Sequence, residues 1–340
     1  MKTAQNADVR PREPILPTGR GVLSDGVLRA LRARPGREGP LPSDGAVDET
    51  DPYSEDLHLA LYLCYELHYR GFHDVDPAWE WNPALLGLRA GLERRFLEAL
   101  RTDTETRSRS ADEAFAGILV EPLDGTGLSH FLRDEGELWH LREYAAQRSL
   151  YHLKEADPHA WVLPRLRGRA KAGMAAVEFD EYGAGSAGRM HSRLFADLMT
   201  DLGLDTTYGR YVDVATEGML ASVNLMSMFG LHRALRGALV GHFAAVEVTS
   251  SPASQRLAEA MRREGAGAAA VHFYAEHVEA DAVHEQVVRR EVVGGLLEEE
   301  PWLEADVVFG IESTDLLDAR LGEKTLSAWR QGRSSLRTPV

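Results

Sequence analysis

The sequence is poor in cysteine and has no long apolar run. Cys64 is the single cysteine among 340 residues, which excludes an internal disulfide framework, a zinc ribbon and a thiolate-held cluster. No stretch approaches the roughly 18 uninterrupted apolar residues typical of a transmembrane helix, and the N-terminus lacks the apolar segment of a signal peptide. We therefore expect a soluble, cytoplasmic protein that does not insert into membranes.

Positive charge is also scarce. Fifty-three acidic side chains stand against 38 basic ones, which gives a formal net charge of −15. Proteins that bind nucleic acid or anionic membranes need a basic face, so we expect neither partner. The hydrophobic share of 44% and the charged share of 27% are those of an ordinary globular protein. The length allows one large domain with an extension, or two domains.

Prolines are concentrated at the N-terminal end. Residues 1–50 contain six of the fifteen prolines, and we expect a flexible Pro/Arg-rich tail there, with Val22–Leu31 as its candidate for ordered structure. Residues 51–135 are predicted to form an N-terminal helical extension packed against the main domain. The main domain is expected to span residues 136–335.

Helical periodicity dominates from Asp51 onward, and sustained strand alternation is hard to find. The fold class is therefore predicted to be all-α. Asp157 and Pro158 are typical of a helix start, and we expect the helix that follows to bury a stripe of apolar residues. The other predicted helices cover residues 57–69, 138–155, 189–202, 215–229, 232–248, 253–264, 267–293 and 302–318, with one more beginning at Pro83. The stripe after Pro158 consists of Leu163, Leu166, Ala170, Met174 and Val177.

Glu181 occupies the position where that stripe predicts its next apolar residue. A carboxylate on a buried face must be protonated, paired or bound to a metal, because an isolated buried charge is very costly. The alternative is that the helix has reached solvent by this point, since Gly183 follows closely.

A second signal lies near the C-terminal end. His277, Asp281 and His284 are spaced i, i+4 and i+7, which places them on one helical face together with Phe273 and Val288. Two imidazoles and a carboxylate on an inward face fit a site for iron, manganese or zinc. The alternative is a solvated charged face, which fits three other acids of this segment better: Glu276, Glu279 and Glu285.

One helix cannot complete a metal's coordination, so further ligands must come from elsewhere. His191 lies ten residues after Glu181, which on a continuous helix is ~15 Å and too far for one site. Three glycines lie between them and can turn the chain: Gly183, Gly185 and Gly188. Glu155, just before the helix start at Asp157, offers another carboxylate.

Other motifs have simpler interpretations. The G-x-G-x-x-G of residues 183–188 lacks the preceding strand of a dinucleotide fingerprint and is interpreted as a hinge between helices. Glu55-x-x-His58 and Glu137-x-x-His140 match the motif of ferritin-like bundles, but both glutamates stand at helix starts, where capping explains them. Cys64 is expected in the core.

The segment His232–Ser250 places Glu247 on an apolar stripe, beside a row of small residues that can admit a helix or a substrate. We assign Glu247 and Tyr274 to the wall of a substrate pocket, the first as a contact for a substrate amine and the second as a hydroxyl that supports a ligand. The alternative for both is a structural polar group with its hydrogen bonds satisfied. The small residues are Gly237, Gly241 and Ala244.

The candidate ligands follow one another at characteristic spacing: Glu155, Glu181, His191, His277, Asp281 and His284. The surrounding phrases are LKEADPHAW, DEYGAGSAGRMH and FYAEHVEADAVHE. This pattern resembles the heme-oxygenase-like di-iron oxidases and oxygenases, also described as iron-containing redox enzymes. The resemblance covers roughly residues 136–320, about half of the chain.

The resemblance implies a heme-oxygenase-like bundle of seven helices that binds two Fe(II) ions rather than heme. By position, the six residues become the iron ligands, and Glu181 is our choice for the carboxylate that bridges the two ions. Members of the family activate O2 for N-oxygenation of amines, oxidative decarboxylation of fatty acids or cleavage of amino-acid side chains. An external electron donor and a homodimer stay open.

We therefore predict a non-heme di-iron oxidase or oxygenase, with O2 as co-substrate, that oxidises a small organic metabolite. Charge supports this prediction, because three adjacent carboxylates repel one another and two ferrous ions would offset them. Two alternatives stay open. One is a ferritin-like protein that binds iron without substrate chemistry, and the other is a metal-free bundle resembling thiaminase-II-like hydrolases or a binding module.

Overall fold

The computed structural model describes residues 13–104, 110–119 and 125–340, and these form an all-α fold, as predicted. The described part contains no strand and no helix that is long and apolar enough to cross a bilayer. Its α-helices are α1 (Val22–Leu31), α2 (Asp44–Glu49), α3 (Glu55–Glu66), α4 (Pro83–Thr104), α5 (Ala111–Leu119), α6 (Leu128–Asp134), α7 (Leu138–His152), α8 (Asp157–Ala160), α9 (Gly168–Glu181), α10 (His191–Asp201), α11 (Glu217–Leu231), α12 (Arg236–Arg263), α13 (Ala268–Val287), α14 (Gly294–Glu299) and α15 (Glu304–Trp329).

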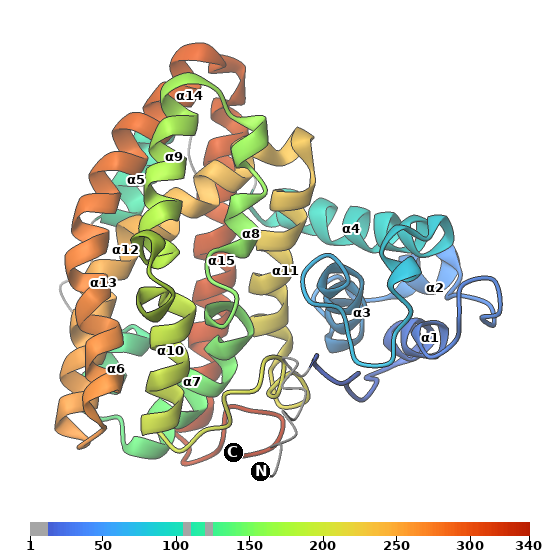
Figure 1. Ribbon diagram of the computed structural model, residues 1–340, viewed down its shortest axis with the longest axis horizontal. Coiled ribbons are helices and arrows are strands. Elements are labelled where there is room, and N and C mark those ends of the chain that lie inside the picture. Colours follow the sequence, from blue (N-terminus) through green and yellow to red (C-terminus); the bar gives the residue numbers. More distant parts are fainter. Residues whose placement is uncertain (1–12, 105–109, 120–124) are drawn as a thin grey trace, which may run out of the picture.

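The long helices α7, α9 to α13 and α15 stand side by side as a bundle (Figure 1). Helix α12 lies against α13 on one side and α15 on the other. Small residues make the α12–α15 contact close: a Cβ on Gly241 would overlap the carbonyl of Val307, and one on Gly310 would overlap the carbonyl of Ala238. The row of small residues around Gly241 therefore admits a helix.

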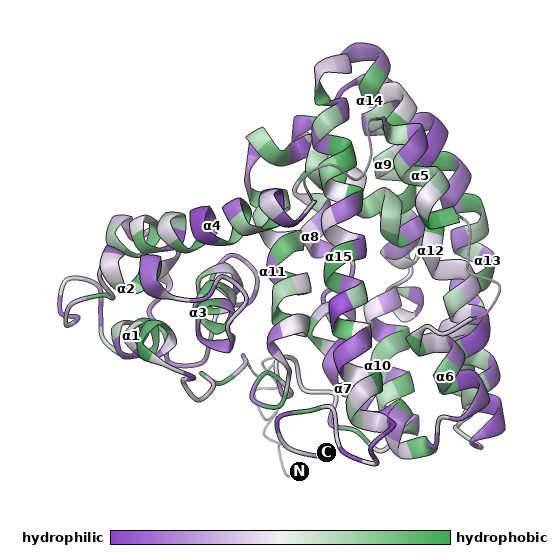
Figure 2. Ribbon diagram, turned by 180° about the vertical axis from the view of Figure 1, so that it is seen from behind, coloured by the Kyte–Doolittle hydropathy of each residue, from purple (hydrophilic) through white to green (hydrophobic). Residues whose placement is uncertain are grey.

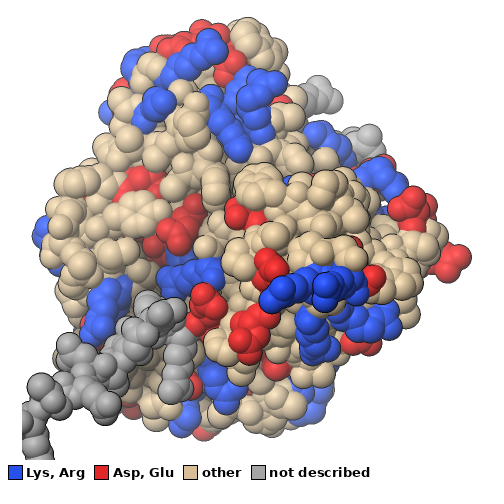
Figure 3. Space-filling view, turned by 45° about the vertical axis from the view of Figure 1, so that its right-hand side comes forward, with Lys and Arg blue, Asp and Glu red and all other residues tan. Residues whose placement is uncertain are grey.

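The surface of the protein mixes hydrophobic and hydrophilic residues. Hydrophobic segments alternate with hydrophilic ones along the bundle helices, as expected for helices with one buried face (Figure 2). On the face shown in Figure 3, lysine and arginine side chains are interspersed with aspartates and glutamates.

Helices α1 to α4 form a lobe beside the bundle, and α4 leads from this lobe toward it (Figure 1). Helix α3 is buried for almost its whole length, because α1, α4 and α11 of the bundle all pack against it. The amide of Asn224 on α11 donates to the backbone oxygen of His58 on α3, at 2.8 Å, and both residues are fully buried. The extension therefore shares a core with the bundle.

Part of the predicted N-terminal tail is packed. Val22–Leu31 forms α1, in which Leu23, Val27 and Leu31 are fully buried. The carboxylate of Asp56 accepts hydrogen bonds from the backbone nitrogens of Leu23 and Ser24, at 2.9 and 2.8 Å, and so caps the start of the helix. Residues 1–12 of that tail lie outside the described residues.

Several predicted helices differ clearly from the structure. The predicted helix 302–318 is α15, which extends to Trp329. The helix expected after Pro158 is interrupted, because α8 ends at Ala160 and α9 begins only at Gly168, so Leu163 and Leu166 lie outside α9. The predicted helices 232–248 and 253–264 are one helix, α12, with Pro252 inside it. Proline costs a helix interior about 3 kcal/mol. Packing of α12 against α13 and α15 offsets that cost. The predicted helix 267–293 is α-helical only to Val287 and continues as a π-helix over Val288–Val293.

A buried ion pair joins the extension to the bundle next to Glu155. The ammonium of Lys154 lies 3.0 Å from a carboxylate oxygen of Glu66, and both side chains are almost fully buried. The same ammonium lies 4.0 Å from the ring centroid of Tyr69, and the guanidinium of Arg70 donates to the backbone oxygen of Leu153. Residues of and just after α3 thus fix the chain immediately before Glu155.

Removing one partner of this pair leaves the other as an isolated buried charge. We expect Lys154→Met to lower the free energy of unfolding by about 3–5 kcal/mol. The double variant Lys154→Met/Glu66→Leu should lose much less, because no charge is left unpaired. Urea denaturation of the two single variants and the double variant measures this, and additive losses would contradict it.

Candidate metal centre

The bundle brings seven acidic and histidine side chains together from five places in the chain. Helix α13 supplies three of them, in register on one buried face as predicted. The seven are Glu155 from the loop between α7 and α8, Glu181 at the end of α9, His191 at the start of α10, Glu247 from the middle of α12, and His277, Asp281 and His284 from α13.

The turn between α9 and α10 brings Glu181 and His191 together. Gly183 and Gly185 have φ angles of 73° and 82°, in the left-handed region that glycine adopts readily. A Cβ on Gly183 would lie 2.6 Å from the backbone nitrogen of Met190, so the return of the chain also requires glycine there. The interpretation of these glycines as a hinge is confirmed.

The seven side chains form two groups, in each of which one ligand atom per residue lies within 4.8 Å of the others. All seven are buried, and the most exposed retain 6% of their surface. The first group is Glu155, His191 and His277, and the second is Glu181, Glu247, Asp281 and His284.

Glu181 connects the two groups. One of its carboxylate oxygens lies 2.7 Å from Nδ1 of His191 in the first group, and the other lies 3.6 Å from Nδ1 of His284 in the second. The rings of His191 and His277 are 4.4 Å apart between centroids. The two groups are therefore parts of one continuous cluster.

Two of the histidines are oriented from outside the cluster. Nδ1 of His277 lies 2.7 Å from the backbone oxygen of Phe273, and Nε2 of His284 lies 3.4 Å from a carboxylate oxygen of Asp180. With the outer nitrogen donating to these acceptors, the inner nitrogen carries a free lone pair. Metal-binding histidines are held in this way in proteins.

Several ligand atoms inside the cluster form no hydrogen bond of regular geometry within the described part of the chain, although two of the histidine nitrogens lie close to carboxylate oxygens. All of these atoms are buried inside the cluster. Buried polar atoms usually have a hydrogen-bond or metal partner. These ligand atoms are Nδ1 of His191, Nε2 of His277, Nδ1 of His284, Oε2 of Glu247 and Oδ2 of Asp281. Imidazole nitrogens and carboxylate oxygens are the ligands that iron takes in such centres, so this set fits a metal.

The carboxylates of the cluster differ in pKa. Burial opposes ionisation of Glu155, but three histidines, His152 with its Nδ1 3.0 Å from the carboxylate, His277 and His191, together outweigh burial and lower the pKa to about 2. Burial, followed by the charge of Glu155, raises the pKa of Glu181 well above its usual value. Burial also raises the pKa of Glu247 and of Asp281 to about 7 each.

The surroundings of His284 favour its charged form. Burial disfavours its charged form, but the close contact with the carboxylate of Glu247 and the charges of Glu247 and Glu181 raise its pKa to about 9. Without a cation, the cluster therefore retains protons on His284 and on those of its acids whose pKa is raised, Glu181, Glu247 and Asp281. Binding of a divalent metal must displace those protons, so metal affinity should rise with pH.

Glu178 is a further buried acid beside the cluster that the sequence pattern did not reveal. It lies one turn before Glu181 on α9, is 2% exposed, and neither carboxylate oxygen has a hydrogen-bond partner in the described chain. Burial, together with the charge of Glu181, raises its pKa to about 9. Glu178 is therefore protonated at neutral pH in the metal-free protein.

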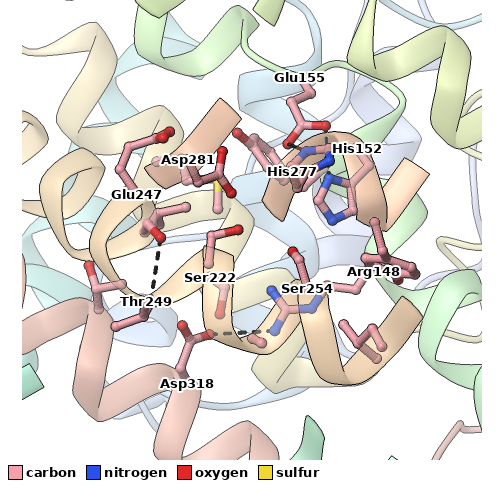
Figure 4. A pocket seen from close by; sticks show the side chains of 18 of the residues that line it. Arg148, His152, Glu155, Ser222, Glu247, Thr249, Ser254, His277, Asp281 and Asp318 are labelled. Carbon is pink, nitrogen blue, oxygen red and sulfur yellow. Dashed lines mark hydrogen bonds and ion pairs between the residues drawn. The ribbon is translucent and has the colours of Figure 1, made fainter. Parts of the chain in front are cut away.

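A cavity of about 320 Å³ adjoins the cluster. Glu155, Glu247, His277 and Asp281 lie together on one side of it (Figure 4). Tyr274 also lines it, as expected for a pocket wall. Glu247 lines the cavity too, but it is equally a member of the second group, with a carboxylate oxygen 3.3 Å from Nδ1 of His284.

The other motifs have the structural roles that were expected. Glu55 lies in the first turn of α3, behind the capping residue Ser54, and Glu137 forms a reciprocal cap with His140 at the start of α7. Cys64 is buried in the core at 3% exposure. Neither E-x-x-H motif contributes to the cluster.

Glu178 gives a pH prediction for the metal-free protein. Because its pKa is raised in the fold, its contribution to stability is complete below the unfolded value of 4.5 and is lost as the pH rises toward 9. Glu178→Gln cannot ionise, so its stability relative to the unmodified protein should increase from about pH 5 to about pH 9, by about 1 kcal/mol or more.

Urea denaturation in the presence of a chelator, repeated across this pH range, measures the difference. Glu276→Gln is the control, because Glu276 is exposed on α13. A stability difference for Glu178→Gln that stays constant with pH would contradict the prediction.

Comparison with known proteins supports an iron site. No curated protein matches the chain significantly. The sequence profile of a family described as iron-containing redox enzymes matches residues 142–319, a little over half of the chain. This match spans all seven residues of the cluster. The chain belongs to the iron-containing redox enzyme family, and its fold is a heme-oxygenase-like helical bundle.

Proposed function

We propose that the protein is a non-heme di-iron oxidase or oxygenase that uses O2 to oxidise a small organic molecule. The observation that carries this proposal is the pair of buried ligand groups joined by Glu181 beside a cavity. Membership in an iron-containing redox family supports iron as the metal.

In this proposal each group would hold one Fe(II) ion. Glu155, His191 and His277 would hold the first, and Glu247, Asp281 and His284 would hold the second. Glu181, which contacts a histidine of each group, would be shared by the two groups. Glu247 would thereby be a seventh ligand rather than only part of a pocket wall. The four carboxylates carry four negative charges when ionised, which two ferrous ions neutralise, so the buried centre has no net charge.

When bound, ferrous iron would supply the electrons that reduce O2. The protein's own side chains set the conditions for that chemistry. His152 keeps Glu155 ionised and oriented, and Asp180 and the carbonyl of Phe273 fix the imidazoles of His284 and His277. Apolar side chains that line the cavity, such as Leu225 and Phe273, limit the access of water to the centre.

The alternatives explain less of the structure. Iron storage does not require a cavity of about 320 Å³ lined by both ligands and uncharged side chains. A metal-free polar core would pair its buried atoms with one another. Within the described residues, five inner ligand atoms instead form no hydrogen bond of regular geometry, and Nδ1 of His191 and Nδ1 of His284 meet a carboxylate oxygen only as ion pairs. An oxidised small molecule and a bound metal account for both features.

Replacement of His284 tests the proposal. After anaerobic loading with Fe(II), we expect two irons per chain in the unmodified protein and at most one in His284→Ala, because the second group loses its only imidazole. Substrate-dependent O2 consumption should fall to background in the same variant. Metal analysis and an oxygen electrode provide the two measurements.

Glu279→Ala is the matched control, because Glu279 is exposed on the same helix. It should bind two irons and consume O2 normally. Full iron content and activity in His284→Ala would remove His284 from the centre. One iron per chain in the unmodified protein would refute a di-iron centre.

A further inference from the structure

The cavity beside the metal cluster meets a second, larger cavity. This outer cavity of about 760 Å³ lies between the start of α6, α7 and the C-terminal half of α15. Four residues line both cavities: Tyr144 and Arg148 on α7, Ala253 on α12 and Asp318 on α15. None of these four residues belongs to the metal cluster. We call the place where they meet the junction.

Exposure to solvent increases from the metal cluster toward the outer cavity. The residues of the cluster retain at most 6% of their surface. At the junction, Tyr144, Arg148 and Ala253 are half-buried, and Asp318 is exposed. Several residues of the outer cavity are exposed as well, among them Ser327. A molecule that enters the outer cavity from solvent therefore meets the junction before it reaches the cluster.

An ion pair spans the junction. Arg148 and Asp318 extend toward each other from two different helices, and Nη2 of Arg148 lies 3.9 Å from Oδ1 of Asp318 (Figure 4). A single water molecule between these two atoms would need about 5.5 Å, because each of its hydrogen bonds takes about 2.8 Å. No molecule therefore passes between the two charged groups while they are paired.

The pair can separate without loss of the fold. The side chains of Arg148 and Asp318 are 23% and 46% exposed, respectively, and water screens the attraction between charges that are exposed to this degree. The ring of Tyr144, one turn before Arg148 on α7, lies 5.5 Å from the guanidinium carbon of Arg148. This ring remains beside the cation when Asp318 moves away. Arg148 therefore keeps a partner in the open state.

The side of the junction formed by α12 is small. Ala253 presents only a methyl group there, and Pro252 precedes it inside the helix. Proline has no N–H, so the carbonyl of Val248 lacks its usual helical hydrogen bond at this level of α12. The backbone of α12 is thus less restrained beside the junction, and the free space there depends on the small size of Ala253.

We propose that Arg148, Asp318 and Ala253 form a gate between the two cavities, through which molecules from solvent reach the metal cluster. The ion pair closes the gate, and its separation opens it. Ala253 limits the size of the molecules that pass. The gate goes beyond the proposed function, since it controls access to the cluster whichever metal ions are bound there.

Thr249 marks the competing route into the inner cavity. It is exposed and lines the inner cavity, one turn before Ala253 on α12, but it is not among the described residues that line the outer cavity. A molecule that entered beside Thr249 would bypass the ion pair. The experiment must therefore distinguish the two routes.

The test measures how fast a thiol in the inner cavity reacts with methyl methanethiosulfonate, a small uncharged reagent. Ser222→Cys supplies the inner thiol, because Ser222 lines the inner cavity and is 6% exposed. Ser327→Cys supplies a control thiol in the outer cavity. The single native cysteine, Cys64, is 3% exposed, and its rate in the unmodified chain gives the background. Mass spectrometry follows the reaction.

Three variants change the gate. In the Ser222→Cys protein, Ala253→Trp should slow the reaction about tenfold or more, because the indole ring fills the junction. Ala253→Leu should slow it less, and this milder change keeps the test valid if circular dichroism shows that the tryptophan variant folds poorly. Asp318→Ala should accelerate the reaction about two- to fivefold, the factor that corresponds to the loss of a partly exposed ion pair.

Thr249→Trp is the matched control, because it adds the same side chain one turn away on α12. It should leave the inner thiol's rate unchanged, and Ala253→Trp should leave the rate of the Ser327→Cys thiol unchanged. The gate is refuted if neither Ala253 variant slows the inner thiol, if Thr249→Trp slows it equally, or if Asp318→Ala has no effect.

All rates are measured on the full chain, both loaded with Zn²⁺ and after chelation, so the result does not depend on iron or on turnover. Since iron content is measured separately, failure of the gate would leave the di-iron proposal standing. Conversely, a chain without a di-iron centre would still show the gate in these rates.

Discussion

The burial of four carboxylates in one place is the constraint on which the structure depends. Glu155, Glu181, Glu247 and Asp281 lie within a single cluster in a helical bundle, where unpaired negative charge is very costly. In the absence of a cation, protons must offset this charge, and the raised pKa values of Glu181, Glu247 and Asp281 reflect that requirement. A divalent metal pair offsets the same charge without protons. A metal bound there would thus contribute to the stability of the fold as well as to the chemistry.

The bundle meets this constraint by placing the side chains of the cluster at helix ends as well as on helix faces. Glu181 ends α9 and His191 begins α10, and the glycine turn between them lets both point into one space. Glu155 stands in a loop whose preceding residue, Lys154, is paired with Glu66 of the extension. The N-terminal lobe therefore contributes to the centre indirectly, by fixing the chain that carries one of its ligands.

Sequence reasoning found the parts of the centre that local geometry determines. His277, Asp281 and His284 lie on one helix, so their spacing alone places them on one face. Glu181 was recognised as an acid in a buried stripe. The predicted stripe was too long, because Leu163 lies before the start of α9. Its members within α9 were nevertheless enough to identify Glu181 as a buried acid. The resemblance of the sequence to a known family supplied the order of the remaining ligands.

The rest depends on tertiary packing that no short pattern contains. Glu247 was recognised as an acid on an apolar stripe, yet its place in the cluster depends on how α12 lies against α13. Arg148 and Asp318 look like ordinary polar residues of amphipathic helices, and only the shape of the cavity distinguishes them. The sequence analysis predicted two helices, 232–248 and 253–264, but α12 is continuous through Pro252, and its contacts on both sides outweigh the local preference of proline.

The location of the metal tests the central claim most directly. Crystals grown anaerobically with Fe(II) can be measured by anomalous diffraction at the iron absorption edge. The account predicts two peaks per chain, one among Glu155, His191 and His277 and the other among Glu247, Asp281 and His284, with Glu181 between them. A single peak, or iron bound away from these residues, would contradict a di-iron centre.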